Sequence, residues 1–139
     1  YKGMKNVEVN FPLIEDITME VAHKYGMLMP GESSTKAVRA VFFIDPKGII
    51  RTIVYYPLSL GRNFQELYRV AVGLQTADAF SVALPADWQP GDDVIVPTAG
   101  SCGVAKQRME SKDEMTCYDW FFCTKKLDKE KVLTTVLKK

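Results

Sequence analysis

The chain has 139 residues, a length that suits one domain of ordinary size, and 47% of them are hydrophobic, which is enough for a substantial core. Its 18 basic and 17 acidic residues give a net charge of +1, so no field of one sign is available to attract nucleic acid or an anionic membrane. No apolar run approaches the roughly 20 residues that cross a bilayer, and the first residues lack the apolar centre of a secretory signal.

Two elements are predicted near the start of the chain. Phe11–Ile14 has the character of the end of a short strand. Asp16 can then cap a helix that runs to about Leu28, because its side chain can accept hydrogen bonds from amides of the first turn. Four apolar residues at three- and four-residue spacing give this helix one apolar face: Ile17, Val21, Tyr25 and Leu28.

A strand and a tight turn follow. Ala37–Ile44 is nearly continuous in apolar residues and rich in branched and aromatic side chains, which predicts a central strand covered on both faces. In Asp45–Gly48, proline presets φ for a turn and glycine supplies a positive φ, so we expect a hairpin. Ile49–Tyr56 is then the return strand.

Asn63 and Glu66 have the spacing of a capping box, which predicts a helix that begins at Phe64 and runs to about Ala79. Residues 81–127 contain several prolines and glycines, which interrupt helices and strands. We therefore interpret this segment as an irregular arm in which only Val94–Val96 is strand-like. A short charged helix at Ala105–Glu114 and a charged helical tail at 128–139 complete the prediction.

This order of elements predicts an α/β fold with the C-terminal part of one domain in residues 1–80 and an arm in residues 81–139. About three strands and two helices are few for a self-contained sheet, so we expect a further part of the domain in front of this sequence.

Arg39 is the most informative single residue. A guanidinium within an apolar strand is unfavourable to bury unless an anion or hydrogen-bond acceptors meet it. It is either an edge-strand or ion-paired structural residue, or a fixed positive charge that lowers a thiol pKa and stabilises a developing oxyanion. Arg62, where a loop enters the second predicted helix, is either a solvated surface residue or one that reaches over the strand ends, where α/β proteins place their sites.

The three cysteines, Cys102, Cys117 and Cys123, all lie in the last third of the chain. An odd number is a poor framework for a secreted disulfide scaffold and suits a reducing compartment, so we expect a cytoplasmic location. We treat Cys102 as incidental, because neither aromatic nor basic residues adjoin it.

The segment Cys117–Cys123 has no common zinc spacing, and the lone His23 is more typical of a helix surface than of a metal ligand. Its two cysteines either pack as small hydrophobes beside the aromatics or present a thiol on a mobile arm that the aromatics dock. Lys125 and Lys126 would then favour the Cys123 thiolate.

The ordered set of segments resembles the peroxiredoxins. Val38–Arg51 is similar to the characteristic hairpin of that family, and Tyr56-Pro57, Gly61–Asn63 and Leu74-Gln75 are similar to its continuation. Ala86–Asp92 is similar to its Pro/Ala-x-Trp-x-x-Gly-Asp segment. The Cys117–Cys123 segment resembles the archaeal and bacterial long-arm form of the one-cysteine-like (peroxiredoxin 6) subfamily, and the match covers nearly all of residues 7–127.

The resemblance implies a thioredoxin-like fold and reduction of hydrogen peroxide or alkyl hydroperoxides through a cysteine sulfenic acid. Arg39 matches the active-site arginine that lowers the thiol pKa and binds peroxide, and Arg62 matches a second, supporting arginine. Cys123 aligns with the resolving cysteine, which acts on a partner subunit, and Cys117 aligns with an accessory arm cysteine that can exchange disulfides with it. No metal or organic cofactor is expected. The implied partners are an external thiol reductant, thioredoxin- or glutaredoxin-like, and other copies of the chain in domain-swapped dimers and decamers.

The sequence departs from the family in one respect. None of its three cysteines lies in the peroxidatic motif Pro-x-x-x-Thr/Ser-x-x-Cys, and His23 does not match the histidine that accompanies this motif. We therefore expect no normal peroxidase turnover by this chain alone. The alternative hypothesis is a non-catalytic thioredoxin-like oligomerisation or binding module, in which the cysteines only pack. A chaperone-like holdase is known for the wider family, but nothing in these residues specifically supports it.

Overall fold

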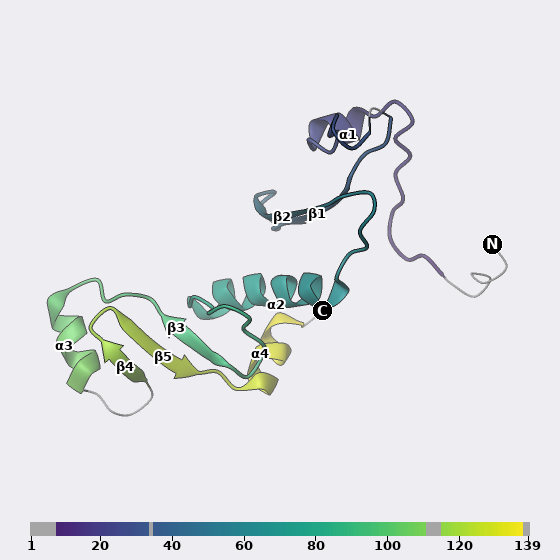
Figure 1. The fold of residues 1–139 in the computed structure, drawn as a ribbon. Coiled ribbons are helices and arrows are strands. Elements are labelled where there is room, and N and C mark those ends of the chain that lie inside the picture. The colour runs from purple at the N-terminus through teal and green to yellow at the C-terminus, as the bar shows by residue number, and fades with distance from the viewer. Residues whose placement is uncertain (1–7, 34, 111–114, 138–139) are drawn as a thin grey trace. The chain divides into compact units, whose positions relative to one another are not determined.

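The computed structural model describes residues 8–33, 35–110 and 115–137. Its elements, in chain order, are α1 (Glu20–Lys24), β1 (Arg39–Ile44), β2 (Ile50–Tyr56), α2 (Phe64–Phe80), β3 (Asp93–Val96), α3 (Cys102–Glu110), β4 (Thr116–Asp119), β5 (Phe122–Lys126) and α4 (Lys129–Val136) (Figure 1). They fall into two compact units. The first comprises the described residues up to Phe42 together with Thr52–Arg62, and the second comprises Phe43–Arg51 and the described residues from Asn63 onward.

The first helix is shorter than predicted. The Asp16 carboxylate does cap it, accepting hydrogen bonds from the amides of Val21 at 3.0 Å and Ala22 at 2.8 Å. However, α1 begins only at Glu20 and ends at Lys24, since Met19 before it and Gly26 after it both have positive φ. The predicted apolar face is also wrong, because Ile17 is 82% exposed and the buried residue of α1 is Ala22.

The predicted strand at Phe11–Ile14 does not form. This segment has no strand partner within the described residues, and Phe11, Leu13 and Ile14 are all exposed. A strand exists only where a neighbouring strand receives its backbone hydrogen bonds, so an apolar sequence is not sufficient to make one.

The hairpin is confirmed. The Gly48 amide donates to the Asp45 carbonyl at 2.9 Å with Gly48 at φ +79°, and the Asp45 amide donates to the Ile49 carbonyl at 2.9 Å. In the described part of the chain β1 and β2 form a two-stranded sheet. The expectation of a central strand covered on both faces is therefore wrong for the described residues, among which β1 has one neighbouring strand and is mostly half-buried.

Helix α2 is also confirmed, with one correction to its cap. The Asn63 side chain accepts from the amides of Gln65 at 3.1 Å and Glu66 at 3.2 Å. The Glu66 carboxylate, which would complete a capping box, instead binds the Arg69 guanidinium at 2.6 and 2.8 Å.

The segment after α2 is more ordered than the predicted irregular arm. Strand β3 covers the predicted Val94–Val96, but β4 and β5 add two strands that were not predicted, giving an antiparallel sheet in the order β3-β5-β4. The predicted helix at Ala105–Glu114 begins earlier, at Cys102, and its last four residues lie outside the described part of the chain. The predicted helical tail at 128–139 forms over Lys129–Val136, with Asp128 as the cap of α4, and its last two residues lie outside the described part of the chain.

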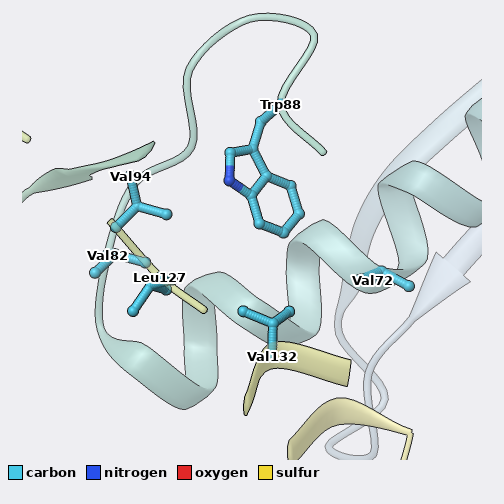
Figure 2. Close-up of a cluster of buried hydrophobic side chains, with 6 residues drawn as sticks. All are labelled: Val72, Val82, Trp88, Val94, Leu127 and Val132. Carbon is cyan, nitrogen blue, oxygen red and sulfur yellow. The ribbon is translucent and has the colours of Figure 1, made fainter. Parts of the chain in front are cut away.

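The second unit has its own core (Figure 2). Trp88 lies at its centre with 1% of its surface exposed, and its indole N–H donates to the Asp92 carbonyl at 3.3 Å. The other buried members come from α2, β3, α4 and the loops beside them: Val72, Val82, Val94, Leu127 and Val132. Within the described residues, no helix is both long enough and apolar enough to cross a membrane.

Candidate functional site

Arg39 is the first residue of β1 and is half-buried. One terminal nitrogen of its guanidinium donates to the Leu60 carbonyl oxygen at 2.9 Å. None of the ion pairs among the described residues involves Arg39. A guanidinium has five N–H donors, so a single carbonyl leaves most of them available to another acceptor. The first unit therefore holds this positive charge in a fixed place without neutralising it.

Arg62 lies two residues after Leu60, in the loop that leads into α2, and it is exposed. Among the described residues its side chain makes no hydrogen bond or ion pair. The same loop thus carries the carbonyl that fixes Arg39 and the second candidate arginine. Both arginines belong to the first unit.

Cys117 and Cys123 are joined in a disulfide (Figure 1 shows the two strands, β4 and β5, that carry them). The two residues lie directly opposite one another in the antiparallel pair, with Cα atoms 4.0 Å apart, and the register slips between Cys117 and Asp119. Cys123 is only 3% exposed, whereas Cys117 is partly exposed. The sequence left open whether these cysteines only pack; in the structure they are joined covalently.

The aromatic residues between the cysteines do not bury the disulfide. The rings of Tyr118 and Phe122 stack at 5.3 Å, and those of Trp120 and Phe121 meet edge to face at 5.5 Å. All four side chains are exposed, Tyr118 at 68% and Trp120 at 59%. The hairpin tip is thus an uncovered aromatic surface.

Cys102 lines a shallow pocket together with Trp120 of the hairpin tip. Cys102 is a free, exposed thiol at the first residue of α3. His23 is exposed on α1, as expected of a helix-surface residue.

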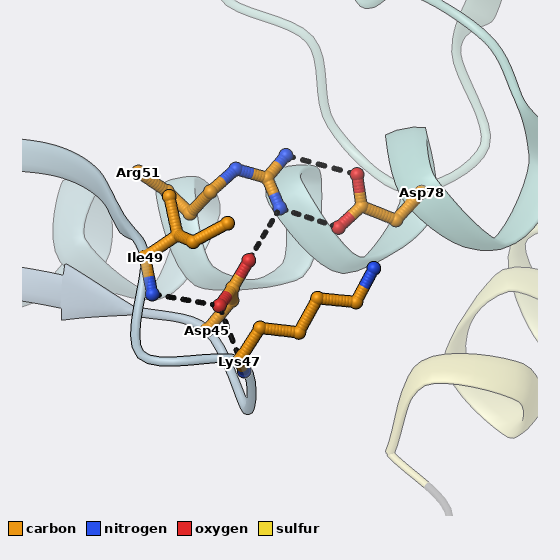
Figure 3. Close-up of polar contacts among 5 residues, drawn as sticks. All are labelled: Asp45, Lys47, Ile49, Arg51 and Asp78. Carbon is orange, nitrogen blue, oxygen red and sulfur yellow. Dashed lines mark hydrogen bonds and ion pairs between the residues drawn. The ribbon is translucent and has the colours of Figure 1, made fainter.

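Sequence reasoning missed one charged contact, shown in Figure 3. The Arg51 guanidinium binds the Asp78 carboxylate through two hydrogen bonds, at 2.6 and 2.9 Å, and lies 3.8 Å from the second oxygen of Asp45. The first oxygen of Asp45 accepts from the amides of Lys47 and Ile49. The contact ties the β1–β2 hairpin tip to α2 within the second unit. Arg51 and Asp78 are 27 residues apart, so no local pattern could reveal the pair.

This contact changes the acidity of both partners. The hydrogen bond from Arg51 lowers the pKa of Asp78, and the same bond raises the pKa of Arg51. On α2, the hydrogen bond from Arg69 lowers the pKa of Glu66 in the same way. All these groups are at least partly exposed, so water screens the interactions and their contribution to stability is small.

Two protein-family models match the chain. Residues 2–53 match the AhpC/TSA family, and residues 73–112 match the C-terminal domain of 1-Cys peroxiredoxin. Together these matches include the strand that carries Arg39 and three residues of the core, Val82, Trp88 and Val94.

Curated relatives match most of the chain. A peroxiredoxin from Methanosarcina mazei is 58% identical over 127 residues, which are 91% of this chain and 58% of that protein. Peroxiredoxin 2 from Caldanaerobacter subterraneus subsp. tengcongensis is 51% identical over 121 residues, which are 87% of this chain and 55% of that protein. The chain therefore spans somewhat more than half the length of these relatives.

Solved structures of peroxiredoxins are also similar to this chain. A yeast mitochondrial 1-Cys peroxiredoxin, solved in a study of its thiol resolving mechanism via glutathione and thioredoxin systems, has a TM-score of 0.74 and 36% identity, over 91% of this chain and 61% of that one. A cysteine-to-serine variant of peroxiredoxin 6 from Arenicola marina has a TM-score of 0.69 and 33% identity over the same shares. These similarities confirm the expected α/β, thioredoxin-like fold.

Proposed function

The chain belongs to the peroxiredoxin family, and on that premise we propose that it carries the arginine and resolving-cysteine half of a thiol-dependent peroxidase. The substrates are hydrogen peroxide and alkyl hydroperoxides. The observation that carries the proposal is the Cys117–Cys123 disulfide, because two cysteines that close reversibly are what regeneration by an external thiol requires.

The proposed reaction has three steps. A peroxidatic thiolate attacks one oxygen of the O–O bond, becomes a sulfenic acid, and releases water or an alcohol. The Cys123 thiol condenses with that sulfenic acid, forming a disulfide and releasing water. Cys117 then exchanges with this disulfide, which returns the peroxidatic thiol and leaves the Cys117–Cys123 pair for an external dithiol to reduce.

Arg39 would act in the first step. Its fixed charge lowers the pKa of a nearby thiol and stabilises the oxygen on which negative charge develops as the O–O bond breaks. The contact with the Leu60 carbonyl supports this role, because it orients the guanidinium without cancelling its charge. Arg62, in the same loop, would support the site.

The reductant and the assembly follow from the same premise. The yeast structural neighbour is described as resolving its thiol through glutathione and thioredoxin systems, so we propose a thioredoxin- or glutaredoxin-like donor here. We further propose domain-swapped dimers, associating into decamers, in the cytoplasm, with residues 81–139 as the dimerisation arm.

The test of the proposal is Cys123→Ser in the protein that also contains the peroxidatic cysteine. Peroxide consumption supported by a thioredoxin system is expected to fall at least about tenfold, because the sulfenic acid has lost the thiol with which it condenses. Cys102→Ser is the matched control and should leave the rate unchanged. If Cys123→Ser recycles as fast as the parent, the resolving role is excluded and the non-catalytic module becomes the better hypothesis.

A further inference from the structure

The disulfide joins two strands that differ in position. The sheet order is β3-β5-β4, so Cys117 lies on an edge strand and Cys123 on the middle strand. Cys123 has a strand neighbour on each side, since it pairs with Cys117 of β4 and with Val96 of β3. The two sulfurs of one disulfide therefore face different surroundings.

This difference decides which sulfur an external thiolate can reach. A thiolate attacks a disulfide sulfur along the S–S axis, from the side opposite the leaving sulfur. To attack Cys123 it must approach from the side of β3, where the paired residue Val96 is itself buried. To attack Cys117 it approaches from beyond β4, which has no second strand neighbour within the described residues.

The exposure of the residues agrees with this geometry. Cys123 is 3% exposed, whereas Cys117 is partly exposed. Helix α3 lies next to β4, and the Arg108 carbonyl oxygen is 3.9 Å from the Cys117 sulfur, so α3 covers part of this residue without burying it. Lys125 lies two residues after Cys123 on β5, so the two side chains are on the same face of this strand.

We propose that Cys117 is the sulfur attacked when an external thiol reduces the arm disulfide, and that Cys123 is the leaving thiolate. The reductant thiolate forms a mixed disulfide with Cys117 while the Cys117–Cys123 bond breaks, and the electron pair of that bond goes to Cys123, which then takes up a proton. A second reductant thiol attacks the reductant sulfur of the mixed disulfide and releases Cys117 as a thiolate, so the reductant leaves oxidised. The inference rests on the proposed function, because it concerns the regeneration step of the same cysteine pair.

The test uses the oxidised chain carrying Cys102→Ser, so that only the two paired cysteines remain. The chain is exposed briefly to reduced glutathione, quenched with acid, labelled with N-ethylmaleimide, digested and mapped by tandem mass spectrometry. Glutathione on Cys117 with maleimide on Cys123 should exceed the reverse pattern by about tenfold or more. Equal amounts, an excess on Cys123, or the absence of a disulfide in the oxidised chain would overturn the inference.

Unfolding the chain tests whether the sheet causes the preference for Cys117. In concentrated guanidinium, where the sheet is lost, the preference should shrink toward equality; a preference that persists unchanged would mean that the fold does not cause it. The Cys123→Ser turnover test is independent of this mapping. If the Cys123→Ser variant recycles normally, the proposed function is excluded, but the mapping result still stands. If glutathione attacks Cys123 in the mapping experiment, only the inference about the attacked sulfur is excluded.

Discussion

At the level of single residues, Arg39 combines a half-buried position in a strand with a charged end. Its strand neighbours are apolar, yet its guanidinium finds only the Leu60 carbonyl as a hydrogen-bond partner within the described residues. A carbonyl offers a partial charge and cannot compensate a full one, so the residue keeps a strong affinity for an anion. One of the two roles that the sequence left open for Arg39 was a structural ion pair. Among the described residues Arg39 forms no ion pair.

Arg39→Lys tests this role in the protein that also contains the peroxidatic cysteine. Lysine keeps the charge but loses the planar set of donors, so kcat/KM for hydrogen peroxide should fall by roughly 10²- to 10³-fold. Stopped-flow peroxide reduction measures it, with Lys36→Gln, a lysine nearby in sequence, as the control that stays at the parent rate. A variant that keeps full activity would exclude a direct contact between Arg39 and the reacting oxygen.

At the level of elements, α2 shows how local signals act. Asn63 stabilises its first turn by accepting from two amides that lack partners within the helix. The apolar residues of α2 differ in burial, because Val72 enters the core whereas Phe64 is 74% and Tyr68 53% exposed. Which apolar residues are buried depends on the elements that pack against the helix, and here these are α4 and the loop around Trp88.

Asn63→Ala should lower the free energy of unfolding by about 1 kcal/mol, since alanine offers the two amides no acceptor. Asn63→Asp is the matched control, because a carboxylate accepts the same hydrogen bonds and adds a favourable interaction with the helix dipole. Urea unfolding followed by circular dichroism compares the two. Equal loss in both variants would mean that the cap does not stabilise α2.

The Arg51–Asp78 contact predicts a pH-dependent stability. The pKa of Asp78 in the folded chain is lowered from 3.8, so its contribution is complete above 3.8 and is lost as pH falls through the lower, folded pKa. Asp78→Asn should therefore be slightly less stable than the parent at neutral pH, and the difference should close below pH 3.8. Urea unfolding across this range measures it, with Asp93→Asn, an exposed carboxylate on β3, as control. A difference that stays constant with pH would contradict an ionic origin.

At the level of the whole molecule, the two units differ in how much apolar surface they cover. The second unit has a core around Trp88, whereas the first exposes the apolar side chains of Phe11, Leu13 and Ile14. Apolar patches of this kind are typical of surfaces that another element covers. The relatives of this chain are longer than the chain itself, so their activity belongs to more residues than are present in it.

The isolated chain should consume no peroxide above the rate of a variant in which all three cysteines are serine. Each of its cysteines lies outside the peroxidatic motif, and Cys123 is buried in a disulfide, so no thiol has the context that the first step requires. A peroxide electrode measures this directly in the presence of a thioredoxin system. Turnover at a rate normal for the family would show that one of these cysteines acts as the peroxidatic thiol.

The local chemistry of the sequence determined the hairpin and the cap of α2, because a Pro-Lys-Gly turn or an Asn before a helix acts within a few residues. It also identified Arg39, Arg62, Cys117 and Cys123 as candidates. Tertiary structure alone decided the rest: that Phe11–Ile14 forms no strand, that Arg51 binds Asp78, and that β4 and β5 join β3 in one sheet. Strand pairing and burial depend on partners that are distant along the chain. Pairing of β5 with both β3 and β4 therefore places Cys123 in the middle of the sheet and Cys117 at its edge.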